Sequence, residues 1–162
     1  VYQYLEYFEE AFIFFSLRKY AASTRTGEQS AAKIYCVDNG LLFLGENEDR
    51  GRKLENLVFQ EMLRRGFLPN KNLFYYNYSG GEIDFLLTHG QKAAAIIQVC
   101  YDMSHYQTRE RELKALISAG KALSCKNLFV ITANEKEETI YKKQKIKVLS
   151  YFDFVLSKFP SN

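Results

Sequence analysis

The sequence has few cysteines, no long apolar run and little net charge, and each shortage argues against a class of protein. Its three cysteines, Cys36, Cys100 and Cys125, form no CxxC pair and no metal-ligand spacing, which favours a reducing, cytoplasmic compartment over a disulfide framework. No apolar run reaches the ~18 residues of a membrane helix, so we expect no membrane partner. A formal charge of +3 is too small to indicate nucleic-acid binding, so any basic surface has to come from local clustering.

What is present indicates one folded domain, or one domain with a small appendage. The chain has 162 residues, of which 47% are apolar and 15% aromatic, enough to bury a sizeable core. It begins with Val1 rather than a methionine, inside an amphipathic helical pattern. We therefore expect the chain to be part of a longer protein.

The first 50 residues have the pattern of the end of a winged-helix module. Helical spacing over the first dozen residues leads into a strand at 12–20, FIFFSLRKY, and a second strand follows at 33–38, KIYCVD. The polar loop between them, within residues 21–32, would be the wing. Its basic residues are open to two interpretations, contact with a DNA phosphate backbone or ordinary solubilising charge on an exposed hairpin. The residues in question are Arg18, Lys19, Arg25 and Lys33.

A charged loop ending at Gly51 predicts the boundary between this appendage, residues 1–50, and a main domain, residues 51–162. The main domain is predicted to be α/β. Its predicted elements are helices at 53–65, at 104–119 (capped by Ser104 and ended by Gly120) and at 151–158, strands at 73–78, 82–87, 93–101, 127–132 and 146–149, and an exposed charged segment at 135–145. The strand–helix–strand step from 93–101 to 127–132 implies a parallel pair of strands.

The candidate chemistry lies on two neighbouring strands of this domain. Period-two alternation puts Glu82 and Asp84 on one face of the first strand, and Gln98 and Cys100 on one face of the second. Acidic residues that face polar residues across a hairpin are typical of nuclease metal sites. The alternatives are a charged hairpin face for the two acids and a small buried apolar residue for Cys100.

Three motifs extend this pattern to a known family. Glu55 in LENLVFQEML, Asp84 in GGEIDFLL and Gln98 with Cys100 in IIQVCYD follow the order of the PD-(D/E)XK nucleases. The segments KIYCVDNGLL, GRKLENLVFQEMLRRG and SGGEIDFLL resemble the C-terminal region of a family of bacterial and archaeal AAA+-like ATPases. In that family a P-loop ATPase module is followed by a winged helix and a domain of unknown function with a restriction-endonuclease-like fold. The resemblance covers essentially the whole chain.

The resemblance implies a restriction-endonuclease-like mixed sheet flanked by helices, preceded by a remnant winged-helix hairpin. It also implies that Asp84 is the main Mg²⁺ ligand, that Glu55 completes the metal shell, and that Gln98 coordinates the metal or orients a water. Cys100 stands where the family has a lysine, and a thiol offers neither a positive charge nor a good ligand for Mg²⁺. Another lysine could serve instead, and Lys92 and Lys114 are candidates.

Three functions follow from this sequence. The first is a non-catalytic or impaired DNA-binding or regulatory module that serves an N-terminal ATPase module of the same polypeptide. The second is an active Mg²⁺-dependent DNA endonuclease with a relocated lysine, and the third is a protein-interaction platform for the ATPase. The chain has no GxxxxGK[ST] motif, so ATP would bind only in the ATPase module outside it.

Overall fold

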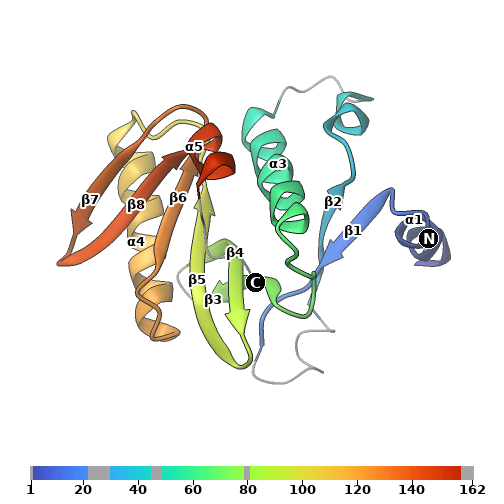
Figure 1. The fold of residues 1–162 in the computed structure, drawn as a ribbon, viewed down its shortest axis with the longest axis horizontal. Coiled ribbons are helices and arrows are strands. Elements are labelled where there is room, and N and C mark those ends of the chain that lie inside the picture. The colour runs from blue at the N-terminus through green and yellow to red at the C-terminus, as the bar shows by residue number, and fades with distance from the viewer. Residues whose placement is uncertain (1, 22–29, 45–48, 79–80, 158–162) are drawn as a thin grey trace.

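The computed structural model describes residues 2–21, 30–44, 49–78 and 81–157. Within these residues, six strands form a mixed sheet in the order β3-β4-β5-β6-β8-β7 (Figure 1). The strands are β3 (Leu73–Tyr78), β4 (Gly81–His89), β5 (Lys92–Val99), β6 (Leu128–Thr132), β7 (Glu137–Tyr141) and β8 (Gln144–Ser150). β5, β6 and β8 run parallel, and β3–β4–β5 and β7–β8 pair antiparallel. The predicted α/β class and the predicted parallel pair β5–β6 are confirmed.

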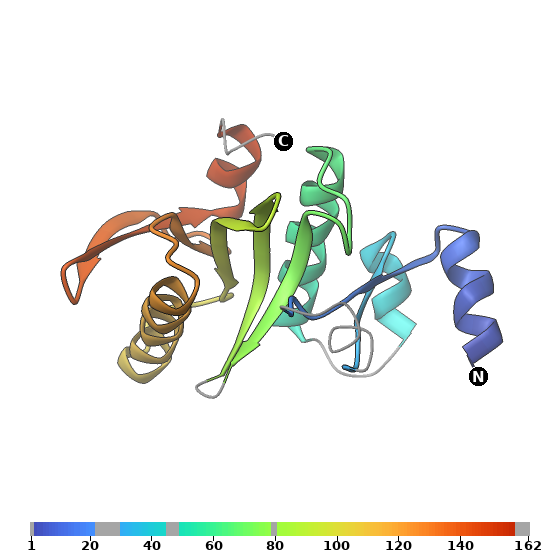
Figure 2. The same ribbon diagram turned by 90° about the horizontal axis from the view of Figure 1, so that it is seen from below.

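Helices cover both faces of this sheet, as Figure 2 shows from below. α4 (Tyr106–Ala122), which connects β5 to β6, lies on one face. α3 (Arg50–Arg64) and α5 (Tyr151–Leu156) lie on the other. Two apolar cores result, one under each layer, because neighbouring strand residues point to opposite faces. Ile96, for example, packs under α4 and Ile97 under α3. Among the described residues, no helix has both the length and the apolar character needed to cross a membrane.

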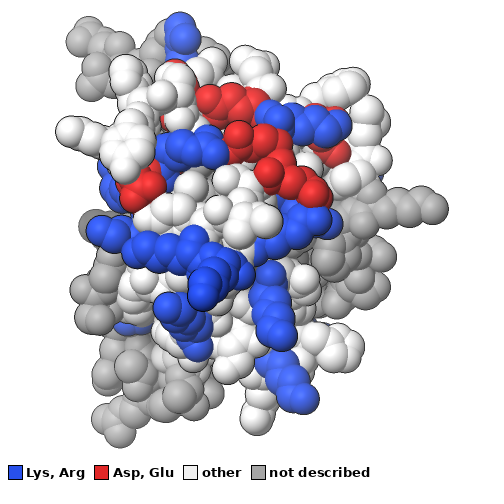
Figure 3. Space-filling view, turned by 90° about the vertical axis from the view of Figure 1, so that its left-hand side faces the viewer, with Lys and Arg blue, Asp and Glu red and all other residues white. Residues whose placement is uncertain are grey.

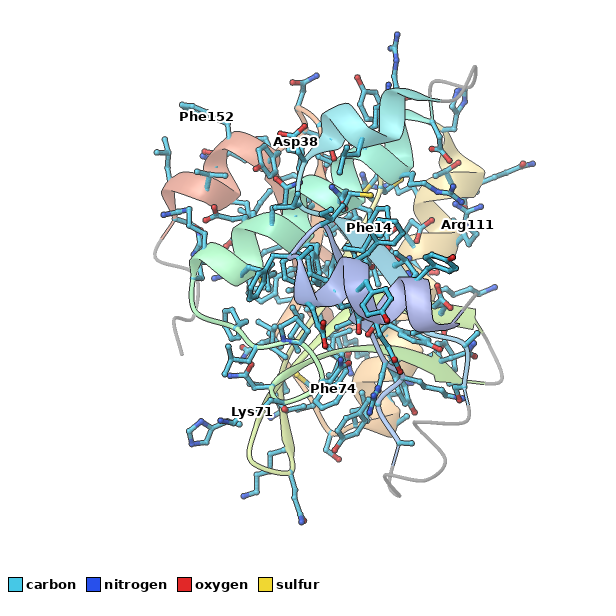
Figure 4. All side chains as sticks on the ribbon, turned by 90° about the vertical axis from the view of Figure 1, so that its right-hand side faces the viewer. Phe14, Asp38, Lys71, Phe74, Arg111 and Phe152 are labelled. Atoms are coloured by element: carbon cyan, nitrogen blue, oxygen red, sulfur yellow. The ribbon has the colours of Figure 1, made fainter. Side chains whose placement is uncertain are left out.

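The N-terminal segment packs on the outer side of α3 (Figure 2). It consists of α1 (Tyr2–Glu10), the antiparallel strands β1 (Phe14–Leu17) and β2 (Lys33–Cys36), and the 3-10 helix η1 (Asn39–Leu44). Leu17 is fully buried, and the Tyr35 ring stacks on the Phe59 ring of α3 with their centroids 4.2 Å apart. In Figure 4, Phe14 marks β1 near the centre of the view. The β1–β2 hairpin therefore shares the apolar core beneath α3.

A β-bulge in β4 shapes the surroundings of Asp84. Leu86 pairs with Phe74 and Ile83 pairs with Tyr76, so two residues of β4 lie opposite the single residue Tyr75. Such a bulge reorients the side chains around it. Asp84 faces the α3 side, where it bonds Lys33, and Phe85 packs on the same side against Phe59.

Three details differ from the sequence prediction. Gly120 does not end α4, since the helix continues to Ala122. Gly120 instead lies where α4 packs closely on Leu128 of β6. A Cβ atom at Gly120 would lie 3.0 Å from the Cys125 carbonyl oxygen and 3.1 Å from a Leu128 methyl carbon, so the glycine permits this close approach. The N-cap of α4 is His105 rather than Ser104. The segment 135–145 is largely exposed, as predicted, but it contains the edge strand β7, which was not predicted.

Candidate functional site

Three carboxylates converge on one ammonium group between α3, β2 and β4. The Lys33 Nζ atom of β2 lies 2.9 Å from an oxygen of Glu55, 2.9 Å from an oxygen of Glu82 and 2.9 Å from an oxygen of Asp84. We call these four side chains the Lys33 cluster. Glu55 comes from the second turn of α3, and the two other acids come from β4 on either side of Ile83. Period-two alternation predicts that Glu82 and Asp84 share a face, and their common contact with Lys33 agrees with this.

Further hydrogen bonds hold the carboxylates in place. The Tyr35 hydroxyl donates to Glu55 Oε1 over 2.7 Å, and the Val99 backbone N–H donates to Asp84 Oδ2 over 2.8 Å. Both oxygens of Asp84 therefore have a donor, one from Lys33 and one from the main chain of β5. A cavity of about 550 Å³ opens beside the cluster. It is lined by Lys33, Ile34, Tyr35, Cys36, Arg52, Glu55, Asn56 and Glu82.

The charges of the Lys33 cluster do not balance, because three ionised carboxylates face one ammonium. Burial, together with the negative charge of Glu55, raises the pKa of the Asp84 carboxyl from 3.8 to about 7. Burial disfavours the charged form of Lys33, but the Asp84 and Glu55 carboxylates outweigh this and raise the pKa of the ammonium. Lys33 therefore stays charged, and Asp84 is the acid of the cluster that takes up a proton near neutral pH.

The Lys33 cluster does not fit a divalent metal ion. An ion held by Glu55, Glu82 and Asp84 would have to occupy the position of the Lys33 ammonium, which contacts all three. In the part of the chain that the structure describes, no group of three or more His, Cys, Asp or Glu side chains is arranged to hold a metal ion. The Mg²⁺ shell expected at Asp84 and Glu55 therefore has a lysine in its place.

Gln98 lies away from the cluster, which differs from the expected arrangement of Glu55, Asp84 and Gln98. Gln98 Oε1 accepts a hydrogen bond from the Asp84 backbone N–H at 3.4 Å, and the side chain lines a second cavity with residues of α4. Since Ile97 faces α3, alternation along β5 turns Gln98 toward α4. Gln98 thus contacts the main chain of Asp84 and not its carboxylate.

Cys100 also lies on the α4 side, in the apolar core that contains Leu113 and Leu116. Its thiol contacts the Asp102 carbonyl oxygen at 3.3 Å. Burial and the nearby charge of Glu112 raise the pKa of the Cys100 thiol to about 11, so the group is neutral at physiological pH. Position 100 is therefore a small, buried core position in this fold.

The lysine that reaches the acids is neither of the two candidates from the sequence. Lys92 lies at the far end of β5, and Lys114 lies on α4, on the opposite face of the sheet from Glu55. Lys33 was missed as the partner of these acids because, as the first residue of the predicted strand 33–38, it was interpreted as a contact to a DNA phosphate backbone. One signal was available: Lys33 and Tyr35 share one face of β2, and Tyr35 is buried.

The four basic residues predicted to contact DNA do not share one environment. The Lys33 ammonium, predicted to contact a DNA phosphate backbone, is engaged by three carboxylates in the structure. Arg18 is exposed at the end of β1, where its backbone N–H donates to Asn70 Oδ1. Lys19 pairs through its main chain with Tyr75 of β3. Arg25 lies outside the described residues.

Comparison with known proteins identifies relatives but no characterised one. The family described as "Domain of unknown function (DUF4143)" matches residues 50–154. An uncharacterized protein of Methanocaldococcus jannaschii is 42% identical over 139 residues, which are 84% of this chain and 30% of that protein. An uncharacterized protein of Haemophilus influenzae is 33% identical over 100 residues, 60% of this chain and 23% of that protein. The chain thus spans less than a third of either relative. No solved structure matches it.

Proposed function

The chain belongs to the DUF4143 family of domains of unknown function, and from that premise we propose that it is a non-catalytic, nuclease-like module that binds DNA and regulates an ATPase of the same polypeptide. One observation carries the non-catalytic part of this proposal. The Lys33 ammonium lies at the centre of Glu55, Glu82 and Asp84, 2.9 Å from each, where a nuclease would hold its metal ion.

The order of elements supports a restriction-endonuclease-like fold for the module. α3 carries Glu55 and precedes the antiparallel strands β3, β4 and β5, and α4 then connects β5 to the parallel strand β6. This is the order in which the nuclease superfamily places its helix acid, its strand aspartate and its central strand. The preceding β1–β2 hairpin supports a remnant of a winged helix whose wing would fall within residues 21–32.

The chemistry of the site supports the loss of catalysis. Hydrolysis of a phosphodiester with Mg²⁺ needs several oxygen ligands around the ion and a group that activates or orients water. In this chain Lys33 engages the carboxylate oxygens, Gln98 faces α4, and Cys100 is a neutral, buried thiol. The ATPase part of the proposal rests on the resemblance of the sequence motifs and on the short share of each relative that the chain covers.

A cleavage assay and a binding assay test this function together. We expect the purified chain, in excess over supercoiled plasmid and with either Mg²⁺ or Mn²⁺ present, to leave the plasmid intact, whereas a metal-dependent nuclease would use such an ion for cleavage. We also expect it to shift duplex or single-stranded DNA at low salt. Nicking by the wild-type chain that disappears in Asp84→Asn would overturn the non-catalytic proposal. No shift of any DNA at low salt would overturn the DNA-binding proposal.

A second candidate, an active endonuclease, is favoured by the same short distances. Lys33 brings an ammonium to Asp84 and Glu55, and a positive charge beside these acids is what the Cys100 position fails to provide. The variant Lys33→Met distinguishes the two functions. An active enzyme would lose its cleavage with this substitution, whereas the non-catalytic module shows no cleavage before or after it.

A further inference from the structure

A second cavity lies between α4 and the start of β4, and its polar groups are mainly hydrogen-bond donors. Its volume is about 590 Å³, within the range of roughly 300–1,000 Å³ that ligand pockets occupy. It is lined by Gly81, Glu82, Gln98, Arg111, Glu112, Lys114, Ala115, Ser118 and Lys142. We call it the α4 cavity. From its charges and donors, we infer that the α4 cavity binds a phosphate group of a polynucleotide or a nucleotide.

One face of α4 supplies basic side chains to the α4 cavity. Arg111, Lys114 and Ser118 are three and four residues apart, so they lie on the same face of the helix. Lys114 and Lys142 have no acidic partner among the residues that the structure describes, and Lys142 contacts the Tyr141 ring at 5.4 Å. Two ammonium groups are therefore available to a bound anion.

Arg111 is held at the edge of the α4 cavity by a buried acid. Its Nε and Nη2 atoms donate to Glu112 Oε1 over 2.9 and 2.6 Å, and the Glu112 side chain is only 5% exposed. A guanidinium has five N–H donors in a fixed fork, so this pair leaves further donors for a ligand. Figure 4 shows Arg111 at the opposite edge of the view from Phe152 of α5. Glu112 therefore orients Arg111.

Gln98 completes the set of donors. Its Oε1 atom accepts a hydrogen bond from the Asp84 backbone N–H. Its amide NH₂ group can therefore donate to a ligand. Of the two acids in the wall, Glu112 pairs with Arg111, and Glu82 shares the Lys33 ammonium with Glu55 and Asp84. Figure 3 shows that basic side chains gather on the face that carries β7 and α4, beside a band of acidic side chains. The wall thus carries three cationic side chains against two acidic ones, and Gln98 and Ser118 add N–H and O–H donors. Positive charge and such donors are what a phosphate requires.

The inference rests on the proposed function for its DNA ligand, and charge reversal of one lysine tests it. Lys114→Glu removes a cation from the cavity wall, and Lys121→Glu makes the same change on the exposed last turn of α4, outside the cavity. We expect Lys114→Glu to weaken the affinity for a fluorescent DNA oligonucleotide about tenfold at low salt, measured by anisotropy. The slope of log affinity against log salt should fall by about one. Lys121→Glu should change the affinity less than about twofold.

Separate arms of the experiment distinguish the sources of the phosphate. Inorganic phosphate and ATP are titrated into ¹⁵N-labelled chain, and the Gln98 side-chain amide signal reports on the cavity. A shift with DNA alone assigns the polynucleotide backbone, and a saturable shift with ATP assigns a nucleotide. Equal loss of DNA affinity in Lys114→Glu and Lys121→Glu, or no Gln98 shift with any of the three probes, overturns the inference. Plasmid cleavage by the wild-type chain would contradict the proposed function and leave these results unaffected.

Discussion

Replacing Lys33 by methionine removes the only cation of the Lys33 cluster and keeps the length and apolar stem of the side chain. Glu55, Glu82 and Asp84 then face one another without a counter-charge. Removing one partner of a buried ion pair costs about 3–5 kcal/mol. The side chains of Lys33, Glu55 and Asp84 are 20%, 23% and 10% exposed, so solvent lowers this cost to about 2–3 kcal/mol. For a chain of this length, that corresponds to a fall in melting temperature of about 5–10 °C.

Urea unfolding at pH 8, followed by circular dichroism, measures this loss. The matched control is Lys145→Met, which removes a 58% exposed lysine paired with the 59% exposed Glu138 and should cost less than about 1 kcal/mol. Adding Asp84→Asn to Lys33→Met should recover part of the loss, because it removes one of the repelling charges. Equal stability of Lys33→Met and Lys145→Met would refute the assignment of Lys33 as the central cation.

Three further predictions concern single side chains. Between pH 3.8 and about 7, the folded chain keeps a proton on Asp84 that the unfolded chain loses. The stabilisation that results is complete below pH 3.8 and is lost as the pH rises through about 7. Asp84→Asn should therefore flatten this part of the profile of unfolding free energy against pH. Arg65→Met should cost about 2–4 kcal/mol in the same assay, because Arg65 pairs with buried Glu61 and donates to carbonyls at the end of α5. Arg64→Met removes a 65% exposed side chain and should cost clearly less than Arg65→Met. Cys100→Lys should destabilise the chain by roughly 2 kcal/mol or more and yield no plasmid cleavage, because position 100 lies in the core under α4.

Local patterns were sufficient for most of the sheet. The aromatic run at 73–78 coincides with β3, and the apolar run near 127–132 coincides with β6 to within one residue. The edge strand β7 was missed because its charged residues show no apolar face by themselves, and its pairing with β8 depends on a turn in which Lys142 and Lys143 both adopt positive φ angles. Non-glycine residues rarely take this conformation, so the sequence carried little sign of it.

The candidate site was predictable only in part, because its key contacts link distant segments. Glu55 and Asp84 were identified from motif order, and both belong to the Lys33 cluster. The bulge at Asp84 depends on the register between β3 and β4, which short-range periodicity does not specify. Two partners of Lys33 lie far from it in the sequence: Glu55 of α3 is 22 residues away, and Asp84 of β4 is 51 residues away. A charge pattern read along the chain cannot reveal such a contact.

A titration of Mn²⁺ into the wild-type chain and into Lys33→Met at pH 8, followed by calorimetry, tests the central claim most directly. If the Lys33 ammonium occupies the cation position of the acidic site, the wild-type chain shows no saturable binding at millimolar Mn²⁺. Lys33→Met, with three carboxylates freed, should gain a site that Asp84→Asn removes again. Stoichiometric binding of Mn²⁺ by the wild-type chain, abolished by Asp84→Asn, would contradict the account and identify the site as a metal centre.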